Sequence, residues 1–389
     1  MVRQNILLIA TTASMIKNFN MSNIEILQKL GAHVYVGTNF EAPGSITVEE
    51  SLHLKKALNK LDVTCYQINF ERRTGSFKNN IKIIKQIRKI IKKNNITGVH
   101  VQSPLGGALG RIAAHNLKNV KILYTAHGFQ FFPGGPKRDW IIFYPIERFL
   151  SSWCDAIITI NKDDYKLAQK FNNKIYYLPG VGTNVNDILD IPQSKKDEIR
   201  KQVRKKLNVT PNDFLVLSVG ELTNRKNHQL MIKALSRIKD KNIKYVIAGV
   251  GQEKKNLQKL VTQYHLKNSV KFLGLLNKSD LSDLYFGSDL NVFVSKREGL
   301  GFGGLDGVIH GVYIIGNGNT GMKDYIINNK IGRLIYDPES VEELTAIVTQ
   351  IVKNKPRISV DQLNYLRKFD YSNINKQMKK IYKRIFFDE

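Results

Sequence analysis

Short apolar runs alternate with amphipathic stretches along this chain, and the alternation starts again in its second half. The runs are rich in isoleucine, valine and leucine and contain few polar residues, as in Ile6–Ala10 and Ala156–Ile160. Strands of this composition are buried on both faces, which is the property of a parallel sheet covered by helices. The sequence therefore predicts an α/β protein with two doubly wound parallel sheets.

The order of the predicted elements follows from these runs. The predicted strands of the first half are Ile6–Ala10, His33–Gly37, Cys65–Asn69, Val99–Gln102, Lys121–Thr125 and Ala156–Ile160. Those of the second half are Phe214–Val219, Lys244–Ala248, Val270–Leu273, Leu290–Val294 and Val312–Ile315. Amphipathic stretches predict helices at Ser22–Leu30, Ile81–Lys93, Lys195–Leu207, Asn227–Lys239 and Lys254–Tyr264.

A polar stretch, Thr183–Asp213, lies between the two halves. It separates a predicted amino-terminal domain, residues 1–185, from a second domain, residues 186–365. A last helix within 366–389 is expected to pack back toward the first domain. Parallel sheets bind ligands beyond the carboxyl ends of their strands, so two such domains facing each other predict a central cleft.

Length and composition support two cores and exclude several classes of protein. A chain of 389 residues with 42% hydrophobic residues exceeds one ordinary core. The two cysteines, Cys65 and Cys154, provide neither a disulfide framework nor the spacing of a metal site. The amino-terminal apolar run is too short for a signal peptide, and no run approaches the roughly 18 residues of a membrane span. A cytoplasmic location is expected.

The formal net charge is +27, and the excess of lysine and arginine is distributed over both halves. A diffuse positive field favours anionic partners, which include nucleic acid, anionic lipid and phosphorylated substrates. A general bias toward lysine, asparagine and isoleucine explains the same composition without any partner. No helix-turn-helix, zinc-finger or aromatic sheet signature accompanies the charge, so nucleic acid is not expected to be the partner.

A glycine-rich turn with two acidic residues follows the strand that ends near Val294. Glu298 opens the turn, Gly301, Gly303 and Gly304 lie within it, and Asp306 follows at the start of a predicted helix. Glycines let backbone N–H groups approach a phosphate, and a helix amino terminus favours an anion. Carboxylates suit hydrogen bonds to hydroxyl groups. The pattern therefore favours a ligand with phosphate and polyol parts, which is the chemistry of a nucleotide sugar.

Several blocks together resemble the retaining glycosyltransferases of family 4. In the second half these blocks are LSVGELTNRKNHQLMIKAL (Leu217–Leu235), VIAGVG (Val246–Gly251), Phe272–Leu276 and the acidic pair at 298 and 306. In the first half VHVQSPLGG (Val99–Gly107) and Tyr124–Asn161 resemble the bacterial enzymes that assemble capsule and exopolysaccharide repeat units. The resemblance covers essentially the whole chain and implies the GT-B fold, with two Rossmann-like domains facing a cleft.

The resemblance also implies roles on the donor side. Lys226 takes the position of a lysine that contacts the donor diphosphate, with Arg225 beside it and Gly220 at the preceding strand end. Glu298 would hydrogen-bond the transferred sugar near the reacting centre. Asp306 would bind the ribose hydroxyls, although the family favours glutamate at this position. The alternative for Asp306 is an aspartate that only stabilises a helix amino terminus.

On the acceptor side the resemblance points to His127, which matches the family's histidine at a strand end. Histidine can donate to a sugar hydroxyl or share a proton near neutral pH, whereas the alternative is a core histidine satisfied by the backbone. His100 stands in its usual place. Gln102, Gln130 and Asn20 occupy positions where relatives carry histidines, so acceptor recognition is expected to differ from that of close relatives.

The segment Phe129–Trp153 concentrates aromatic residues among Lys137, Arg138 and Arg148, which is the composition of a monotopic membrane segment. The lysine-rich helix Lys78–Lys93 is better explained as a surface helix that packs its isoleucines on the sheet. No metal constellation and no DxD motif on a strand-end loop is present, so a metal-free mechanism without a cofactor is predicted.

The predicted function is a retaining glycosyltransferase peripherally associated with the inner face of the cell membrane. It would move a hexose or N-acetylhexosamine from a nucleotide sugar, with UDP as the expected nucleotide, to a polyprenyl-diphosphate glycan in capsule or exopolysaccharide synthesis. The alternatives are a UDP-sugar epimerase of the same fold, an inactive relative and a basic nucleic-acid-binding protein. The donor sugar, the acceptor glycan and the linkage do not follow from the sequence.

Overall fold

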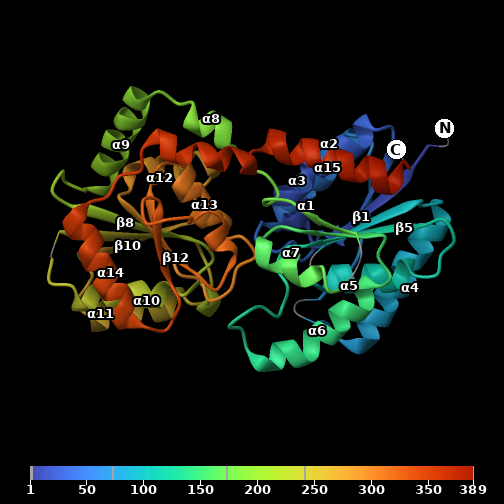
Figure 1. The fold of residues 1–389 in the computed structure, drawn as a ribbon, viewed down its shortest axis with the longest axis horizontal. Coiled ribbons are helices and arrows are strands. Elements are labelled where there is room, and N and C mark those ends of the chain that lie inside the picture. The colour runs from blue at the N-terminus through green and yellow to red at the C-terminus, as the bar shows by residue number, and fades with distance from the viewer. Residues whose placement is uncertain (1–2, 72–73, 103, 172–173, 241, 389) are drawn as a thin grey trace. The chain divides into compact units, whose positions relative to one another are not determined.

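The computed structural model describes residues 3–71, 74–102, 104–171, 174–240 and 242–388. The chain forms two compact units (Figure 1). The first unit consists of two segments, residues 1–182 and 371–389, and the second unit contains residues 183–370. The polar stretch that begins at Thr183 is therefore part of the second unit, and the last helix belongs to the first.

Within the described residues, the first unit has a seven-stranded parallel sheet in the order β3-β2-β1-β4-β5-β6-β7. Its strands are β1 (Asn5–Thr12), β2 (His33–Asn39), β3 (Thr64–Gln67), β4 (Gly98–Gln102), β5 (Lys121–Ala126), β6 (Ala156–Thr159) and β7 (Ile175–Tyr177). Successive residues of a strand point to opposite faces, so Ile6 and Leu8 enter one core while Leu7 and Ile9 enter the other.

Helices cover both faces of this sheet (Figure 1). One face carries α1 (Ala13–Phe19), α2 (Met21–Lys29), α3 (Val48–Lys60) and α15 (Tyr371–Phe386). The other carries α4 (Phe77–Lys93), α5 (Pro104–Ala114), α6 (Lys137–Ser151) and α7 (Lys162–Ala168). The isoleucines of α4 at positions 83, 87, 90 and 91 are buried in the core, as expected for a helix that packs on the sheet.

The described part of the second unit repeats the plan with a six-stranded parallel sheet in the order β10-β9-β8-β11-β12-β13. Its strands are β8 (Phe214–Val219), β9 (Ile243–Ala248), β10 (Val270–Gly274), β11 (Leu290–Phe293), β12 (Tyr313–Asn317) and β13 (Gly332–Ile335). Two parallel sheets with helices on both faces confirm the predicted GT-B class of fold. The edge strands β7 and β13 were not predicted, because they are only three and four residues long and so give a weak hydrophobic pattern.

The helices of the second unit also form two layers (Figure 1). One layer holds α10 (His228–Arg237), α11 (Lys254–Gln263) and α14 (Val341–Asn354), and the other holds α9 (Gln193–Leu207), α12 (Lys278–Gly287) and α13 (Phe302–Ile309). The remaining helical segments are α8 (Val185–Leu189), η1 (Asn224–Lys226), η2 (Gly321–Asp324) and η3 (Val360–Phe369).

The last helix is joined to the first sheet by a buried hydrogen-bond chain. His100 Nδ1 lies 2.8 Å from the Tyr382 hydroxyl of α15, and His100 Nε2 lies 2.8 Å from the Thr125 hydroxyl of β5. His100 and Tyr382 are both fully buried. Residues 282 positions apart are thus tied together inside the core.

We predict that Tyr382→Phe destabilises the first unit, because it leaves a ring nitrogen of His100 buried without its partner. The expected loss in the free energy of unfolding is about 1–3 kcal/mol. Urea unfolding followed by circular dichroism measures it. Tyr336→Phe is the matched control, because the Tyr336 side chain is exposed. Equal stabilities of the two variants would contradict the proposed contribution of the Tyr382 hydroxyl.

Candidate functional site

Each sheet contains one point where the order of the strands reverses, and several predicted site residues lie at the carboxyl ends of the strands near it. In the first unit this point lies between β1 and β4, and in the second between β8 and β11. The two flanking strands send their chains to opposite faces of the sheet, which leaves a crevice at their carboxyl ends. These two edges are the candidate binding positions of the two units.

In the second unit a carboxylate joins two cations across the β8/β11 point. Lys226 Nζ lies 2.6 Å from Glu298 Oε1, and Arg225 Nη1 lies 3.0 Å from the same oxygen. Lys226 comes from the short helix η1 after β8, whereas Glu298 comes from the loop after β11. The structure therefore brings together three of the predicted donor-side residues, although 72 positions separate Lys226 from Glu298.

The geometry leaves one carboxylate oxygen of Glu298 available. Both cations contact Oε1, and among the described residues Oε2 accepts no hydrogen bond. The Lys226 and Glu298 side chains are only 13% and 12% exposed, and Lys226 Nζ also lies 4.7 Å from the centre of the Phe293 ring. A carboxylate with one paired and one unpaired oxygen can accept a hydrogen bond from a hydroxyl while two cations stand beside it.

Two glycines of the turn are required by packing. A Cβ on Gly303 would meet the Phe293 ring at 2.8 Å, and one on Gly304 would meet the Tyr325 hydroxyl. These two positions lack side chains because helix α13 packs directly on the sheet. The expectation that they also bring the backbone close to a phosphate stays a prediction.

At two other predicted positions the backbone conformation requires glycine. Gly301, at the amino terminus of α13, has φ +81°, and Gly220, after β8, has φ +145°. Both values belong to the region that favours glycine. A Cβ on Gly220 would also lie 3.3 Å from the Lys226 chain, so this glycine makes room for the lysine that reaches Glu298.

Asp306 lies in the middle of α13, which begins at Phe302, rather than at the helix amino terminus. Its role is therefore not that of a first-turn aspartate. Asp306 Oδ1 accepts a hydrogen bond from the Thr183 hydroxyl at 3.2 Å, and Oδ2 accepts none from the part of the chain that the structure describes. Burial raises the pKa of the Asp306 carboxyl from 3.8 to about 6.

The candidate residues of the first unit form a neutral hydrogen-bonded chain at the β1/β4 point. His127, which follows β5, places Nε2 2.8 Å from Gln102 Oε1 at the end of β4. Gln102 in turn bonds Asn20, which follows α1 and is buried. Burial lowers the pKa of His127 to about 4, so the ring is neutral at physiological pH.

A small hollow of about 20 Å³ adjoins His127. It is lined by Phe19, Ser22, Asn23, Gln102, Thr125, His127, Ile160, Leu178, Gly180, Val181, Ile374, Asn375 and Met378. Its size suits about one water molecule or a single hydroxyl group.

The structure gives His100 a different environment from that of His127. His100 is fully buried, and both of its ring nitrogens bond to Tyr382 and Thr125, so no ring nitrogen is left for an acceptor. Burial lowers its pKa to about 3. His100 is therefore a core histidine, the alternative considered for His127. Gln130 lies half-buried in the loop after β5.

Sequence reasoning missed the residues that support these groups. Gln102 was noted only as a departure from the family pattern, while Phe293 and Thr183 received no role. The available signal for Gln102 was its place at the end of one predicted strand, since His127 follows the end of another. Phe293 and Thr183 had no signal, because their contacts to Lys226 and Asp306 join distant parts of the chain.

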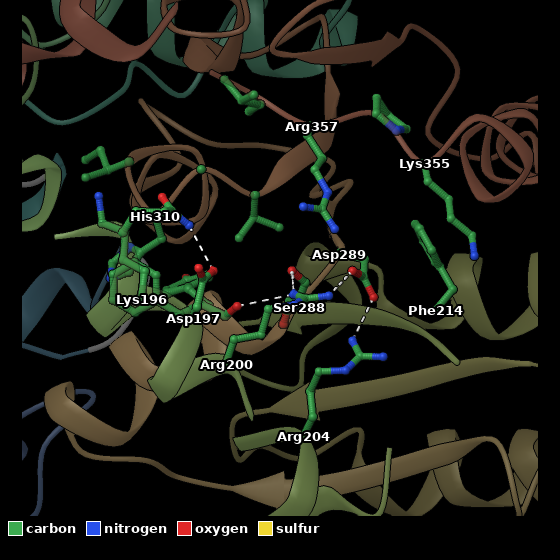
Figure 2. A pocket seen from close by; sticks show the side chains of 18 of the residues that line it. Lys196, Asp197, Arg200, Arg204, Phe214, Ser288, Asp289, His310, Lys355 and Arg357 are labelled. Carbon is green, nitrogen blue, oxygen red and sulfur yellow. Dashed lines mark hydrogen bonds and ion pairs between the residues drawn. The ribbon is translucent and has the colours of Figure 1, made fainter. Parts of the chain in front are cut away.

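A larger hollow of about 320 Å³ lies beside the amino-terminal ends of β8, β11 and β12, at the opposite edge of the second sheet from Glu298. Figure 2 shows that Arg200 and Arg204 converge on Asp289. Arg204 Nη1 lies 2.9 Å from Asp289 Oδ2, and Arg200 also donates to the carbonyls of Gly287 and Ser288. These side chains hold the loop before β11, so this hollow is not the candidate site.

Two features that are absent from the described ranges bear on the remaining expectations. No group of three or more histidine, cysteine, aspartate or glutamate side chains comes together there as a metal site would require. Within the same ranges, no helix combines the length and the apolar character that a membrane-crossing segment needs. The metal-free mechanism stays a prediction.

Comparison with known proteins assigns both halves of the chain. Residues 199–369 match the family model described as glycosyl transferases group 1, and residues 45–161 match the one described as glycosyl transferase 4-like. EpsD of Bacillus subtilis (strain 168), which carries the name of a glycosyltransferase, is 31% identical over 68% of this chain and 70% of its own length. An Escherichia coli protein named UDP-Gal:alpha-D-GlcNAc-diphosphoundecaprenol alpha-1,3-galactosyltransferase is 24% identical over 71% and 73% of the two chains.

Solved structures share the fold at lower identity. Sucrose-phosphate synthase from Thermosynechococcus elongatus has a TM-score of 0.78 at 18% identity, with both chains covered completely. HepE from Anabaena, in complex with UDP and glucose, has a TM-score of 0.72 at 17% identity and covers 98% of this chain and 100% of its own. These similarities support the GT-B fold.

We predict that Asp306→Asn stabilises the second unit above pH 6. The pKa of Asp306 in the folded state exceeds 3.8, so between these two pKa values the native state binds a proton that the unfolded state releases. This bound proton favours the native state at low pH, and the stability that it provides is lost as the pH rises through about 6. The neutral amide avoids this loss, with a gain on the order of 2 kcal/mol at pH 7.5 that shrinks toward pH 4.

Denaturant titrations at pH 4.5 and 7.5 measure the gain, with Asp361→Asn at an exposed position as the control. A difference between Asp306→Asn and wild type that does not depend on pH would show that burial leaves the titration of Asp306 unchanged.

Proposed function

This chain belongs to the GT-B glycosyltransferases, and from that premise we propose that it moves a hexose or N-acetylhexosamine from a UDP-sugar to a lipid-linked glycan with retention of configuration. The observation that carries the proposal is the single oxygen of Glu298 shared by Lys226 and Arg225. The names of the EpsD and galactosyltransferase relatives support a place in capsule or exopolysaccharide synthesis and a polyprenyl-diphosphate acceptor.

The second unit supplies the donor half of the site. Lys226 and Arg225 bind the diphosphate and stabilise the negative charge that develops on it as the glycosidic bond breaks. Glu298 turns its free Oε2 to a hydroxyl of the transferred sugar, while Oε1 keeps both cations in position. Asp306 keeps Oδ1 on Thr183 and offers Oδ2 to a ribose hydroxyl.

These cations let the reaction proceed without a metal. Two side-chain charges meet the leaving group, so the diphosphate needs no further positive ion for the bond to break. The leaving phosphate oxygen takes the proton of the attacking hydroxyl on the same face of the sugar, which retains the anomeric configuration. No side chain acts as a covalent nucleophile.

The first unit supplies the acceptor side through His127. Its ring is neutral, half-buried and bonded through Nε2 to Gln102, so it is held in one orientation beside the small hollow. A fixed neutral imidazole can bond a sugar hydroxyl without adding charge to the site.

The outer face of α6 is the part of the first unit that we assign to the membrane. Its exposed apolar residues follow helical spacing and are Ile141, Ile142, Pro145, Ile146 and Phe149. Ile141 and Phe149 are 74% and 61% exposed. Residues at intervals of three and four share one face of a helix, so these side chains form a continuous apolar stripe.

Charges around the stripe match an anionic bilayer. Lys137, Arg138 and Arg148 are exposed on α6, whereas the acidic Glu147 turns inward to Arg111. Arg111 Nη1 lies 2.9 Å from Glu147 Oε1, and the fully buried guanidinium also stacks 4.1 Å from the centre of the Tyr124 ring. This buried contact fixes which face of α6 points outward. A basic apolar helix face of this kind binds the surface of an anionic membrane without crossing it.

A transfer assay tests the donor half. Wild-type protein with UDP-, GDP- and dTDP-sugars and a polyprenyl-diphosphate glycan is expected to transfer sugar from a UDP donor. Glu298→Gln should lose transfer by about a hundredfold or more, the size of one strong transition-state contact. The same variant should bind UDP more tightly, because Lys226 and Arg225 are no longer neutralised.

Glu339→Gln is the matched control, because Glu339 forms an ion pair with Lys296 in the same region but does not contact Lys226. Transfer that survives in Glu298→Gln would refute the role of Glu298. UDP-sugar turnover that yields free or epimerised sugar without acceptor glycosylation would favour the epimerase alternative. Salt-sensitive binding to nucleic acid in place of any transfer would favour a nucleic-acid-binding protein.

Vesicle sedimentation tests the membrane face. Wild type is expected to bind vesicles that contain phosphatidylglycerol and to bind phosphatidylcholine vesicles weakly. Ile141→Ser combined with Phe149→Ser removes two large side chains from the stripe, which should weaken binding by about tenfold or more.

Phe77→Ser is the control, because Phe77 is exposed on α4 outside the stripe. Equal binding of the stripe variant and the control would contradict the assignment of α6 to the membrane. Equal binding of wild type to both kinds of vesicle would contradict the preference for anionic lipid.

A further inference from the structure

A chain of three polar side chains runs from the main chain of α1 to the His127 ring. It starts at the carbonyl of Met15, passes through the side chains of Asn20 and Gln102, and ends at His127 Nε2. Asn20 follows α1 and Gln102 ends β4, so the chain crosses the reversal point of the first sheet. Each link has a definite hydrogen-bond direction, which can be followed from one end to the other.

The first link fixes the orientation of Asn20. The Met15 carbonyl can only accept, and the nitrogen of the Asn20 amide lies 3.0 Å from it. A turned amide would place two oxygens against each other. Asn20 Oδ1 is therefore the acceptor that faces Asn23 Nδ2 at 3.1 Å.

The second link passes this orientation to Gln102. The two amides meet in a reciprocal pair, in which Asn20 Nδ2 donates to Gln102 Oε1 at 3.0 Å and Gln102 Nε2 donates to Asn20 Oδ1. Turning Gln102 alone would oppose nitrogen to nitrogen and oxygen to oxygen. Its oxygen must therefore be the atom that faces His127.

The third link decides the protonation of the imidazole. Gln102 Oε1 can only accept, so His127 Nε2, 2.8 Å away, must carry the hydrogen. Because burial holds the ring neutral, with a pKa of about 4, its other nitrogen then carries a lone pair. Among the described residues, Nδ1 has no hydrogen-bond partner, whereas both ring nitrogens of His100 are engaged.

We propose that Asn20 and Gln102 are positioning residues that hold His127 as the Nε2–H tautomer, so that Nδ1 accepts a hydrogen bond from a substrate hydroxyl. The substrate contact rests on the proposed function, whereas the tautomer is a property of the first unit alone. Gln102 suits this task better than the histidine that relatives carry there, because an amide does not titrate and its two ends cannot exchange roles while Asn20 is held by the main chain.

Nitrogen-15 NMR of the histidine-labelled full chain tests the tautomer directly. The His127 signals are assigned by their loss in His127→Gln. Wild type is expected to show a protonated, pyrrole-type Nε2 and an unprotonated, pyridine-type Nδ1 near pH 7. A pyridine-type Nε2 would overturn the proposal.

Asn20→Ala tests the relay, because Asn20 does not itself touch His127. Without the Asn20 amide, Gln102 can turn its own amide nitrogen toward the ring, so a fraction of His127 should change to the Nδ1–H form. Asn23→Ala is the matched control: it removes a neighbouring donor to Asn20 Oδ1 but leaves the Met15 carbonyl in place, and the tautomer should not change. An unchanged tautomer in folded Asn20→Ala would refute the positioning role.

Gln102→Glu is a second variant of nearly the same shape. A carboxylate beside the ring stabilises the protonated imidazole, so the pKa of His127 should rise and its titration should move toward neutral pH. An unchanged titration would show that residue 102 does not contact the ring, and this result would overturn the proposal even if Asn20→Ala did not fold.

The transfer assay separates the two parts of the proposal. Asn20→Ala should lower kcat/KM by about fivefold to tenfold, the value of one net hydrogen bond, with UDP affinity unchanged because the donor residues lie in the other unit. A shifted tautomer with unchanged kcat/KM would refute the substrate contact of Nδ1. The expected tautomer in a protein that transfers no sugar would instead refute the proposed function and leave the relay intact.

Discussion

Parallel pairing of the strands is the constraint from which both candidate binding positions follow. Every strand pair in the described sheets is parallel, so all strands of a sheet end at the same edge, and crossover helices must cover its faces. At β1/β4 and β8/β11 the crossovers diverge and leave that edge open. Glu298 and Lys226 follow the strands at one of these points, while Gln102 and Asn20 meet across the other.

The two candidate binding positions use different electrostatics. The one in the second unit is built from charges, with two cations on one oxygen of Glu298, as suits the binding of a diphosphate. The one in the first unit is built from neutral amides and an imidazole whose pKa burial lowers. In both, one atom of the key side chain bonds to the protein, while another has no partner among the described residues, so the group is oriented and can still bind a ligand.

The sequence predicted much of the fold and part of the site. Long apolar strands such as β1 and β8 were placed within two residues, because the five buried residues of each give a strong signal. The packing role of Gly303 and Gly304 was not predicted, because glycine is required equally by a nearby phosphate and by the packing that a Phe293 ring and a Tyr325 hydroxyl impose. His100 and His127 looked alike in sequence, and only their partners distinguish them.

By itself the sequence determined the two α/β units, the family and the residue types at the edge of each sheet, because hydrophobic period and motif spacing are local properties of the chain. The tertiary structure alone decided which atoms are free to act. Asn20 and Gln102 are 82 positions apart, and Arg225 and Glu298 are 73 apart. Hydrogen-bond direction and charge pairing depend on partners that only folding brings within 3 Å. No local pattern could therefore reveal that, among the described residues, Glu298 Oε2 and His127 Nδ1 have no partner.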